Sequence, residues 1–273
     1  MGTSIAAWRS SIAALVFALS VPSMAVSAPL VGHGSNATFY DLDLDTGAAL
    51  NPRDVGTTPL IGISLSNDGV LFGVGFNDRV YTIDPIAGTS QLVGLLGFSI
   101  GEGDIAFDPT TGTLYGLAFV DSESARHLFT IDTETGLGTD VGAIPVPSLD
   151  PSGMVIDDAG DLYVLDTFHD ELLQIDKTDG AVLLSVELSL SLGSTAGMDI
   201  DPDTGEFYVA DGGGGATDSL YTLDPISGEL SLIGPTGLGQ GLSGIEFIPE
   251  PGTIALLLLG ALSMVRSRRS RTA

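Results

Sequence analysis

The middle of the chain alternates apolar and polar residues in short runs that are separated by turns. In DIAFDPTTGTLYG, which starts at Asp104, the apolar Ile105, Phe107 and Leu114 flank a turn over 108–112. Alternation with a period of two is typical of strands, and Asp, Pro and Gly each favour a tight turn. Between residues 29 and 248 no segment keeps a helical period, since the nearest one, 171–191, alternates too closely. This pattern predicts an all-β domain.

Two sequence elements recur along this domain. The first is a strand that ends in an Asp–Gly turn, as in IDPIAG and IDTETG, and its closing glycines are 41, 48, 44 and 48 residues apart. These are Gly47, Gly88, Gly136, Gly180 and Gly228. The second element is another strand, turn and strand, and it begins at Gly62, Asp104, Gly153 and Gly197.

Together the two elements supply four strands per period of about 45 residues, which is typical of a β-propeller blade. Residues 30–56 match the last three strands of a blade, and GIEFIP from Gly244 matches a first strand. Joined, they make a composite blade, so we predict five four-stranded blades closed by the N- and C-terminal strands. The alternative is a β-solenoid, but its period would be shorter and less evenly spaced by paired turns.

Both ends of the chain have the pattern of processing segments. Arg9, an apolar run over 12–19 and small residues before Ala25 and Ala28 are typical of a secretory signal peptide over 1–28. The alternative is a membrane anchor, but this run is far shorter than the roughly 20 residues that a span needs. Cleavage after either alanine is compatible with the pattern. We therefore expect an exported domain over 29–248.

Charge and composition exclude several classes of function. Only Arg53, Arg79, Arg126 and Lys177 are basic within 29–248, whereas all of the 35 acidic residues except Glu250 lie there. This imbalance makes nucleic acid an improbable partner and favours solubility and cation binding. The chain has no cysteine, so a packed core must hold the exported fold without disulfides, and thiol chemistry is excluded.

Three carboxylates are candidates for a cation site. If the first strands of the repeats line the central channel, then Asp104, Asp199 and Glu246 converge there, and Ca²⁺ is the candidate ligand. The segment DIDPDTGE from Asp199 also has a spacing similar to a calcium loop. The same turn reads FDPTTG, IDDAG and LSNDG elsewhere, so turn formation is the favoured role of its aspartates.

No catalytic residue and no organic cofactor site emerges from the sequence. His33, His127 and His169 lie near expected turns, and nothing in the pattern pairs them with a base or a nucleophile. We expect them to be exposed loop histidines.

The C-terminal 25 residues combine three features in order. They are Pro249-Glu250-Pro251, an apolar run over 254–265, and the arginines Arg266, Arg268, Arg269 and Arg271. This order resembles the PEP-CTERM sorting domain of exported bacterial proteins. The resemblance implies that 249–273 is a sorting signal with a short transmembrane segment and a basic tail. It also implies recognition by an exosortase-type membrane enzyme, processing near Pro-Glu-Pro, and release to the cell surface or an exopolysaccharide matrix. The arginines would stay on the cytoplasmic side.

The repeats themselves are similar in general style to NHL and YVTN propellers, and they lack the Trp-Asp dipeptide of WD repeats. This likeness transfers no catalytic residue. Two hypotheses follow. The first is a binding or structural propeller of the cell envelope or matrix, with polysaccharide, protein or a divalent cation as partner. The second is a cation-dependent hydrolase or lyase acting on a sugar lactone, a phosphate ester or a polysaccharide.

Overall fold

The computed structural model describes residues 29–34, 37–122, 125–212, 218–239 and 241–248. The predicted signal peptide and sorting signal, and the terminal helices that we expect for them, lie outside these residues. Every regular element in the described ranges is a β-strand, and none of these ranges contains a helix long and apolar enough to cross a membrane.

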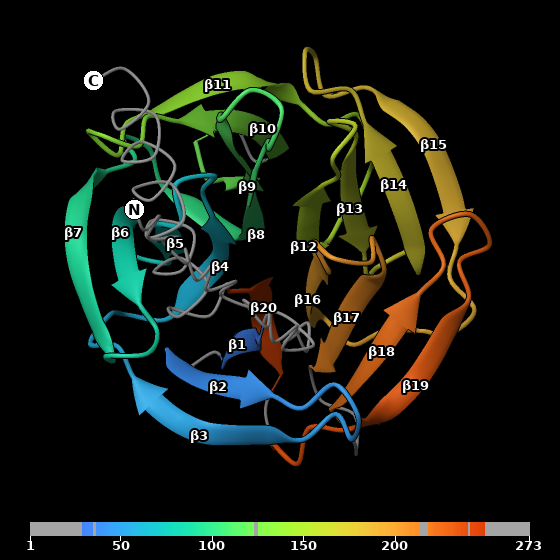
Figure 1. Cartoon of the computed structure of the whole chain (residues 1–273). Coiled ribbons are helices and arrows are strands. Elements are labelled where there is room, and N and C mark those ends of the chain that lie inside the picture. The colour runs from blue at the N-terminus through green and yellow to red at the C-terminus, as the bar shows by residue number, and fades with distance from the viewer. Residues whose placement is uncertain (1–28, 35–36, 123–124, 213–217, 240, 249–273) are drawn as a thin grey trace, which may run out of the picture.

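Within the described ranges, twenty strands form five antiparallel sheets of four, arranged as a ring (Figure 1). The composite blade contains β20 (Leu242–Phe247), β1 (Leu30–Gly34), β2 (Thr38–Leu42) and β3 (Ala49–Asp54). Blade 2 contains β4 (Leu60–Leu65), β5 (Leu71–Gly75), β6 (Arg79–Asp84) and β7 (Thr89–Leu95). Blade 3 contains β8 (Ile100–Phe107), β9 (Leu114–Val120), β10 (Ala125–Ile131) and β11 (Gly138–Ala143).

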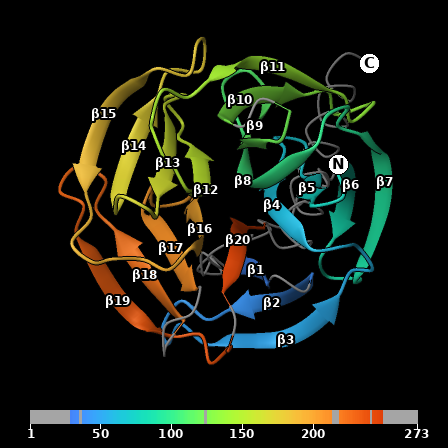
Figure 2. The ribbon, with the colours of Figure 1, turned by 180° about the vertical axis from the view of Figure 1, so that it is seen from behind.

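The remaining blades follow the same order. Blade 4 contains β12 (Pro151–Ile156), β13 (Leu162–Asp166), β14 (Glu171–Ile175) and β15 (Val182–Glu187). Blade 5 contains β16 (Thr195–Ile200), β17 (Phe207–Gly212), β18 (Ser219–Leu223) and β19 (Leu230–Pro235). In each blade the first strand of the sheet lies next to the axis and the last lies at the perimeter, as both views of the ring show (Figure 2). The predicted propeller of five blades is confirmed.

Strands from both ends of the domain close the ring. β1 pairs antiparallel with β20, so that Leu30 lies opposite Phe247, and the Ile248 N–H donates to the Pro29 carbonyl at 2.9 Å. The composite blade predicted from the sequence is therefore present. The N-terminal end of β1 and the C-terminal end of β20 lie side by side.

Apolar side chains fill the space between neighbouring blades. The part of the chain that the structure describes contains five buried clusters, and each joins residues of two adjacent blades. Phe129 of blade 3, for example, packs with Val74 of blade 2, and Phe39 of the composite blade packs with Leu60 of blade 2. The hydrophobic contribution to stability is thus distributed around the ring, which agrees with a fold held without disulfides.

The recurrent Asp–Gly turns also join blades. Asp224 starts one such turn, and its Oδ1 accepts a hydrogen bond from the Ile226 N–H at 2.8 Å. Gly228 closes the turn at a φ of 74°, and a Cβ there would lie 2.0 Å from the carbonyl oxygen of Glu187, on the outer strand of blade 4. Gly47 makes the same approach to Gly234 of blade 5. These glycines are therefore required both by the turn conformation and by a backbone contact with the preceding blade.

Candidate functional site

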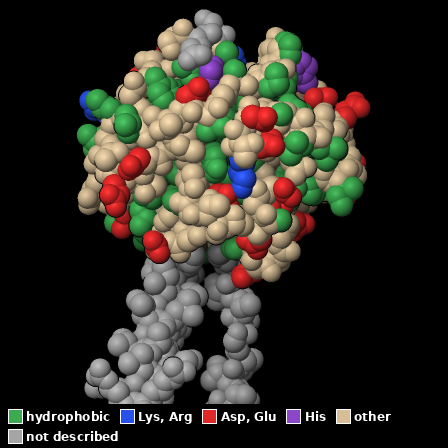
Figure 3. Space-filling view, turned by 90° about the horizontal axis from the view of Figure 1, so that it is seen from above, with side chains coloured by type: hydrophobic (Ala, Val, Ile, Leu, Met, Phe, Trp, Pro, Cys, Tyr) green, Lys and Arg blue, Asp and Glu red, His purple; other side chains and the backbone are tan. Residues whose placement is uncertain are grey.

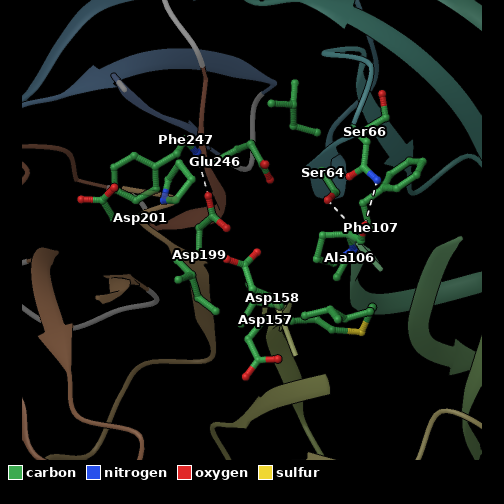
Figure 4. A pocket seen from close by; sticks show the side chains of 18 of the residues that line it. Ser64, Ser66, Ala106, Phe107, Asp157, Asp158, Asp199, Asp201, Glu246 and Phe247 are labelled. Atoms are coloured by element: carbon green, nitrogen blue, oxygen red, sulfur yellow. Dashed lines mark hydrogen bonds between the residues drawn. The ribbon is translucent and has the colours of Figure 1, made fainter. Parts of the chain in front are cut away.

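A cavity of about 600 Å³ opens at one mouth of the central channel. The ends of the five innermost strands, β4, β8, β12, β16 and β20, line it together with turns that follow several of them (Figure 4). The fold places residues of all five blades around one opening in this way.

Acidic side chains dominate the polar lining. The lining residues include no Lys, Arg or His, and the neutral polar groups among them are Ser64, Ser66 and Asn67. The carboxylates are Asp68, Asp157, Asp158, Asp199, Asp201 and Glu246. Phe107, Phe207 and Phe247 are also among the lining residues, and of these three only Phe107 is partly exposed. On the side of the ring seen in Figure 3, acidic side chains also greatly outnumber basic ones. The cavity thus disfavours anionic ligands.

The structure brings the three predicted cation ligands into one channel, at two depths. Asp199 and Glu246 line the cavity, whereas Asp104 is fully buried and does not reach its wall. Burial is the main cause that raises the pKa of both Asp104 and Glu246, and repulsion from Asp199 adds to both shifts, so the three carboxyls lie within electrostatic reach of one another.

Each of these carboxyls also accepts a hydrogen bond from the innermost strand of the next blade. Asp199 Oδ2 accepts from the Phe247 N–H at 2.7 Å, and Asp104 Oδ2 accepts from the Met154 N–H at 2.8 Å. The Leu65 N–H likewise bonds to Glu246 and acts to lower its pKa. The innermost strand of each blade has no neighbouring strand of its own sheet on the channel side. These bonds therefore satisfy backbone N–H groups that would otherwise lack an acceptor.

Three of the five junctions share one register. Ser64, Asp199 and Glu246 occupy equivalent positions of their strands, and Ser64 Oγ accepts from the Phe107 N–H at 2.9 Å (Figure 4). Blade 3 has Ala106 at this position, which cannot accept, and Asp104 supplies the acceptor two residues earlier. In blade 4 the position is Val155, and Ser152 Oγ instead donates to the Ser194 carbonyl at 3.1 Å. Every junction between innermost strands is therefore bridged by a side chain.

Burial changes the protonation of these groups. Burial raises the pKa of Asp199 to about 7, with a smaller contribution from Asp201, although the N–H groups of Phe247 and Ile200 act to lower it. Burial, followed by the charge of Asp199, raises the pKa of Glu246 well above its usual range. Burial likewise raises the pKa of Asp104. The channel therefore holds carboxyl groups that retain protons near neutral pH.

The calcium site stays a prediction. Among the residues that the structure describes, no three His, Asp or Glu side chains are grouped closely enough to hold a metal ion. The calcium-like segment forms a turn, as favoured from the sequence, because Asp201 Oδ1 accepts from the Asp203 N–H at 2.8 Å and Oδ2 accepts from Thr204 Oγ1 at 2.9 Å.

The prediction of exposed loop histidines is wrong for two of the three. His33 lies on β1 and His127 on β10, and both are buried. His33 packs against Phe39, with ring centroids 5.7 Å apart, and burial lowers its pKa to about 4, so it is neutral at physiological pH. His127 Nδ1 lies 2.8 Å from Asp140 Oδ1. Only His169 lies in a turn, where a hydrogen bond with Asp166 raises its pKa.

Sequence reasoning also missed an ion pair between blades. Lys177 Nζ, from the Asp–Gly turn of blade 4, lies 2.5 Å from Asp108 Oδ2 in blade 3. Burial acts to raise the pKa of Asp108, but Lys177 and Thr110 outweigh it and lower the pKa to about 2. Lys177 is the only lysine within 29–248, and a single lysine in so acidic a domain was the one sequence feature that could have indicated an ion pair.

A protein-family model described as a repeat of unknown function, DUF6923, matches residues 104–257. The chain belongs to the DUF6923 family. The match covers blades 3, 4 and 5 and the innermost strand of the composite blade. The repeats within 104–257 are therefore DUF6923 repeats, and the likeness of the chain to NHL and YVTN propellers is one of architecture.

Several solved structures are similar to this DUF6923 protein. A putative gluconolactonase is 17% identical over 76% of this chain and 73% of that chain, with a TM-score of 0.50. TolB from Acinetobacter baumannii is 16% identical over 77% of this chain, with a TM-score of 0.48, and the chain spans 53% of its length. A protein of unknown function from Bacteroides caccae is 14% identical over 75% of this chain and 71% of that chain, with a TM-score of 0.44. At these identities the likeness concerns the fold alone. No curated protein sequence matches the chain.

Proposed function

We propose that this protein is an exported binding propeller of the cell envelope or extracellular matrix, and that its channel mouth holds an uncharged or amine-bearing polysaccharide. The observation that carries the proposal is the 600 Å³ cavity, whose lining has six acidic side chains and no basic side chain. Carboxyl groups form hydrogen bonds with sugar hydroxyls in either protonation state, and the ionised ones attract ammonium groups and repel uronate and phosphate.

The other lining groups support the same ligand class. Ser66 and Asn67 offer neutral polar atoms at the turn after β4, and Phe107, which is partly exposed, offers apolar surface. A site with a few polar groups on a partly apolar wall is typical of small-ligand recognition. Because the lining comes from all five blades, closure of the ring preorganises it.

Calorimetric titration of residues 29–248 tests the proposal. The ligands are oligosaccharides of a neutral glucan, of an amino sugar and of a uronic acid. We expect heat from the glucan or the amino sugar and none from the uronate. D68N and D158N, on the cavity rim, should weaken binding, whereas E229Q, on an exposed surface away from the cavity, should not. Binding of the uronate alone, or equal binding by all variants, would contradict the proposal.

Sorting is the second part of the proposal. The resemblance of 249–273 to a PEP-CTERM signal supports export through the signal peptide, transient membrane insertion, and processing by an exosortase-type enzyme. The polysaccharide ligand agrees with delivery to the cell surface or an exopolysaccharide matrix.

A cation-dependent hydrolase or lyase is the alternative function. One observation favours it: Asp199 lines the cavity with a pKa raised to about 7, in the range suited to a general acid or base. Against it, the three candidate ligands already accept backbone hydrogen bonds. Hydrolysis of a sugar lactone that requires Ca²⁺ and is lost in D199N would establish this alternative. Absence of heat and of thermal stabilisation on Ca²⁺ addition would exclude its metal-dependent form.

A further inference from the structure

The end of blade 4 that faces away from the cavity carries a cluster of polar side chains. β12 runs from Pro151 to Ile156, and the cavity lies at the Ile156 end of this strand. Pro151 pairs with Asp166, so the turn over 167–170, between β13 and β14, lies at the other end of the blade. A strand of six residues is about 20 Å long. The cluster is therefore separate from the cavity.

Asp166 organises this cluster. Its side chain is fully buried, and its Oδ1 accepts hydrogen bonds from the backbone N–H groups of Asp150 and Phe168, both at 3.1 Å. Its Oδ2 lies 2.6 Å from His169 Nδ1, and this hydrogen bond raises the pKa of the histidine. Because Nδ1 faces Asp166, Nε2 lies on the far side of the partly exposed ring. One buried carboxylate thus holds two backbone segments and orients the imidazole, as a preorganised site requires.

An aromatic ring is exposed beside this histidine. The side chain of Phe168 is 63% exposed, although Asp166 anchors its backbone. The rings of Phe168 and His169 lie edge to face, with centroids 4.8 Å apart. One face of a sugar ring consists largely of C–H groups, and such a face buries apolar surface when it stacks on an aromatic side chain. The exposed phenyl ring therefore provides a platform for a sugar.

Hydrogen-bond donors and acceptors are combined next to this platform. Thr167 Oγ1 lies 3.3 Å from Asp150 Oδ2 and 3.1 Å from Ser152 Oγ. The guanidinium of Arg126 lies over the ring of Phe119, with Cζ 4.8 Å from the centroid, and its Nη2 is 3.7 Å from Asp150 Oδ1. A separation of 3.7 Å is too long for a hydrogen bond, so Nη2 can still donate to a ligand. Sugar hydroxyls both donate and accept, and this set of groups serves both roles.

We propose that Phe168, His169, Asp150 and Arg126 form a second carbohydrate site, for an uncharged sugar chain, at the end of the ring opposite the cavity. Phe168 stacks on a sugar ring, His169 Nε2 and Arg126 bond to its hydroxyls, and Asp150 accepts from them. Charges of both signs distinguish this cluster from the cavity, whose lining has no basic side chain, and suit an uncharged ligand.

Binding at the second site does not depend on the proposed function of the cavity. If both sites are occupied, one protein joins two polysaccharide chains, and this consequence does rest on the proposed function. A propeller of this kind would cross-link a matrix without forming an oligomer.

Blade 2 supplies a matched control. Phe76 lies in the equivalent turn, between β5 and β6, and is also exposed, at 47%. Leu60 and Pro151 begin the innermost strands of their blades and pair with Gly75 and Asp166 respectively. Blade 2 therefore has a glycine where blade 4 has the buried carboxylate. The two turns share the exposed phenylalanine and differ in the groups that surround it.

Calorimetric titration of residues 29–248, which contain the whole closed ring, with a neutral β-glucan hexasaccharide tests the second site. We expect two binding events in the wild type, of which F168A weakens one about tenfold. F168W retains an aromatic ring and should bind like the wild type, and F76A should have no effect. D68N and D158N should act on the other event. Circular dichroism checks folding, and H169A is a second variant of the site should F168A fold poorly.

Cross-linking is measured with glucan-coated beads and a soluble fluorescent glucan. The wild-type protein should capture the fluorescent chains on the beads, whereas F168A and D158N should each reduce this capture severalfold. Full capture by F168A would mean that bridging does not use the second site, and would contradict the cross-linking role.

The outcomes separate this inference from the proposed function. If D68N weakens glucan binding and both F168A and H169A bind like the wild type, the second site is refuted and the cavity proposal stands. If F168A weakens binding and D68N does not, the second site stands and the cavity proposal fails. Equal losses in F168A and F76A would show a general loss of apolar surface and would overturn the inference, as would a titration with no heat.

Discussion

The carboxylate of Asp199 accepts a hydrogen bond from the backbone N–H of Phe247 at 2.7 Å. This bond joins blade 5 to the strand that closes the ring, and the same carboxylate lines the cavity. One buried side chain therefore serves ring closure and the candidate site together. A change of protonation at Asp199 is expected to affect both.

The first prediction concerns pH and stability. The pKa of Asp199 is 3.8 in the unfolded chain and about 7 in the folded protein, so the folded state binds more protons between these values. Stability from this group is full below about pH 4 and is lost as pH rises toward 7. Calorimetric melting should give a lower Tm at pH 8 than at pH 5. D199N should reduce this difference and stabilise the protein at pH 8 by at most about 4 kcal/mol. A Tm that rises from pH 5 to pH 8 would contradict the assignment.

The second prediction separates the two roles of Asp104, its charge and its hydrogen bond. D104A leaves the buried Met154 N–H without its acceptor and should cost about 1–3 kcal/mol of unfolding free energy. D104N retains an acceptor oxygen and removes a buried acid, so it should be close to wild type. Urea denaturation measures both variants. Equal losses in the two would show that the bond to Met154 contributes little.

The third prediction isolates the contact between turn and blade. Gly228 and Gly205 have nearly equal φ values of 74° and 75°, but only Gly228 has a backbone oxygen where a Cβ would lie, since nothing lies within 4 Å at Gly205. G205A should cost about 1 kcal/mol through its left-handed conformation. G228A should cost clearly more in the same urea experiment. Similar values for the two variants would mean that blades 4 and 5 separate easily at this turn.

The fourth prediction concerns acid stability. Asp108 has a folded pKa of about 2, below its unfolded value of 3.8, so its contribution is present above pH 4 and is lost as pH falls toward 2. K177M removes the main favourable partner of Asp108 and should move the midpoint of acid unfolding to higher pH. R79M, which removes an exposed arginine, is the control. Circular dichroism during acid titration reports the midpoint, and an unchanged midpoint in K177M would show that the ion pair is not stabilising.

The fifth prediction concerns the sorting signal. Replacement of Pro249, Glu250 and Pro251 by alanine should leave the exported protein unprocessed and bound to the membrane, as detected by fractionation and immunoblotting. Replacement of the four arginines by glutamine should impair retention of the segment across the bilayer. Normal processing and release of the alanine variant would refute the PEP-CTERM interpretation.

The fold could be predicted from the sequence because the signals that specify it are local and repeated. Asp and Gly mark each turn, and the spacing of Gly47, Gly88 and the later glycines gives the number of residues in a blade. The composite blade could also be predicted, because 30–56 lacks a first strand and Gly244 begins one. These features need no knowledge of contacts between distant side chains.

The candidate site could be predicted only in part, because its properties depend on contacts between side chains and backbone of different blades. The sequence indicated that Asp104, Asp199 and Glu246 share a channel, but it gave no sign that each bonds to the next strand. Ser64 shares this role and was missed, since serine is common in strands and turns alike. His33 was misassigned because its burial depends on the contact with Phe39, which follows from the fold of the composite blade.

The closure of the ring would also set the order of events in the proposed export. β1, β2 and β3 would leave the translocation channel first, yet their inner partner β20 would be the last strand of the domain to emerge. The edge of β1 would then remain unpaired until nearly the whole domain had been delivered. A factor that shields strand edges on the far side of the membrane would be of most use in that interval.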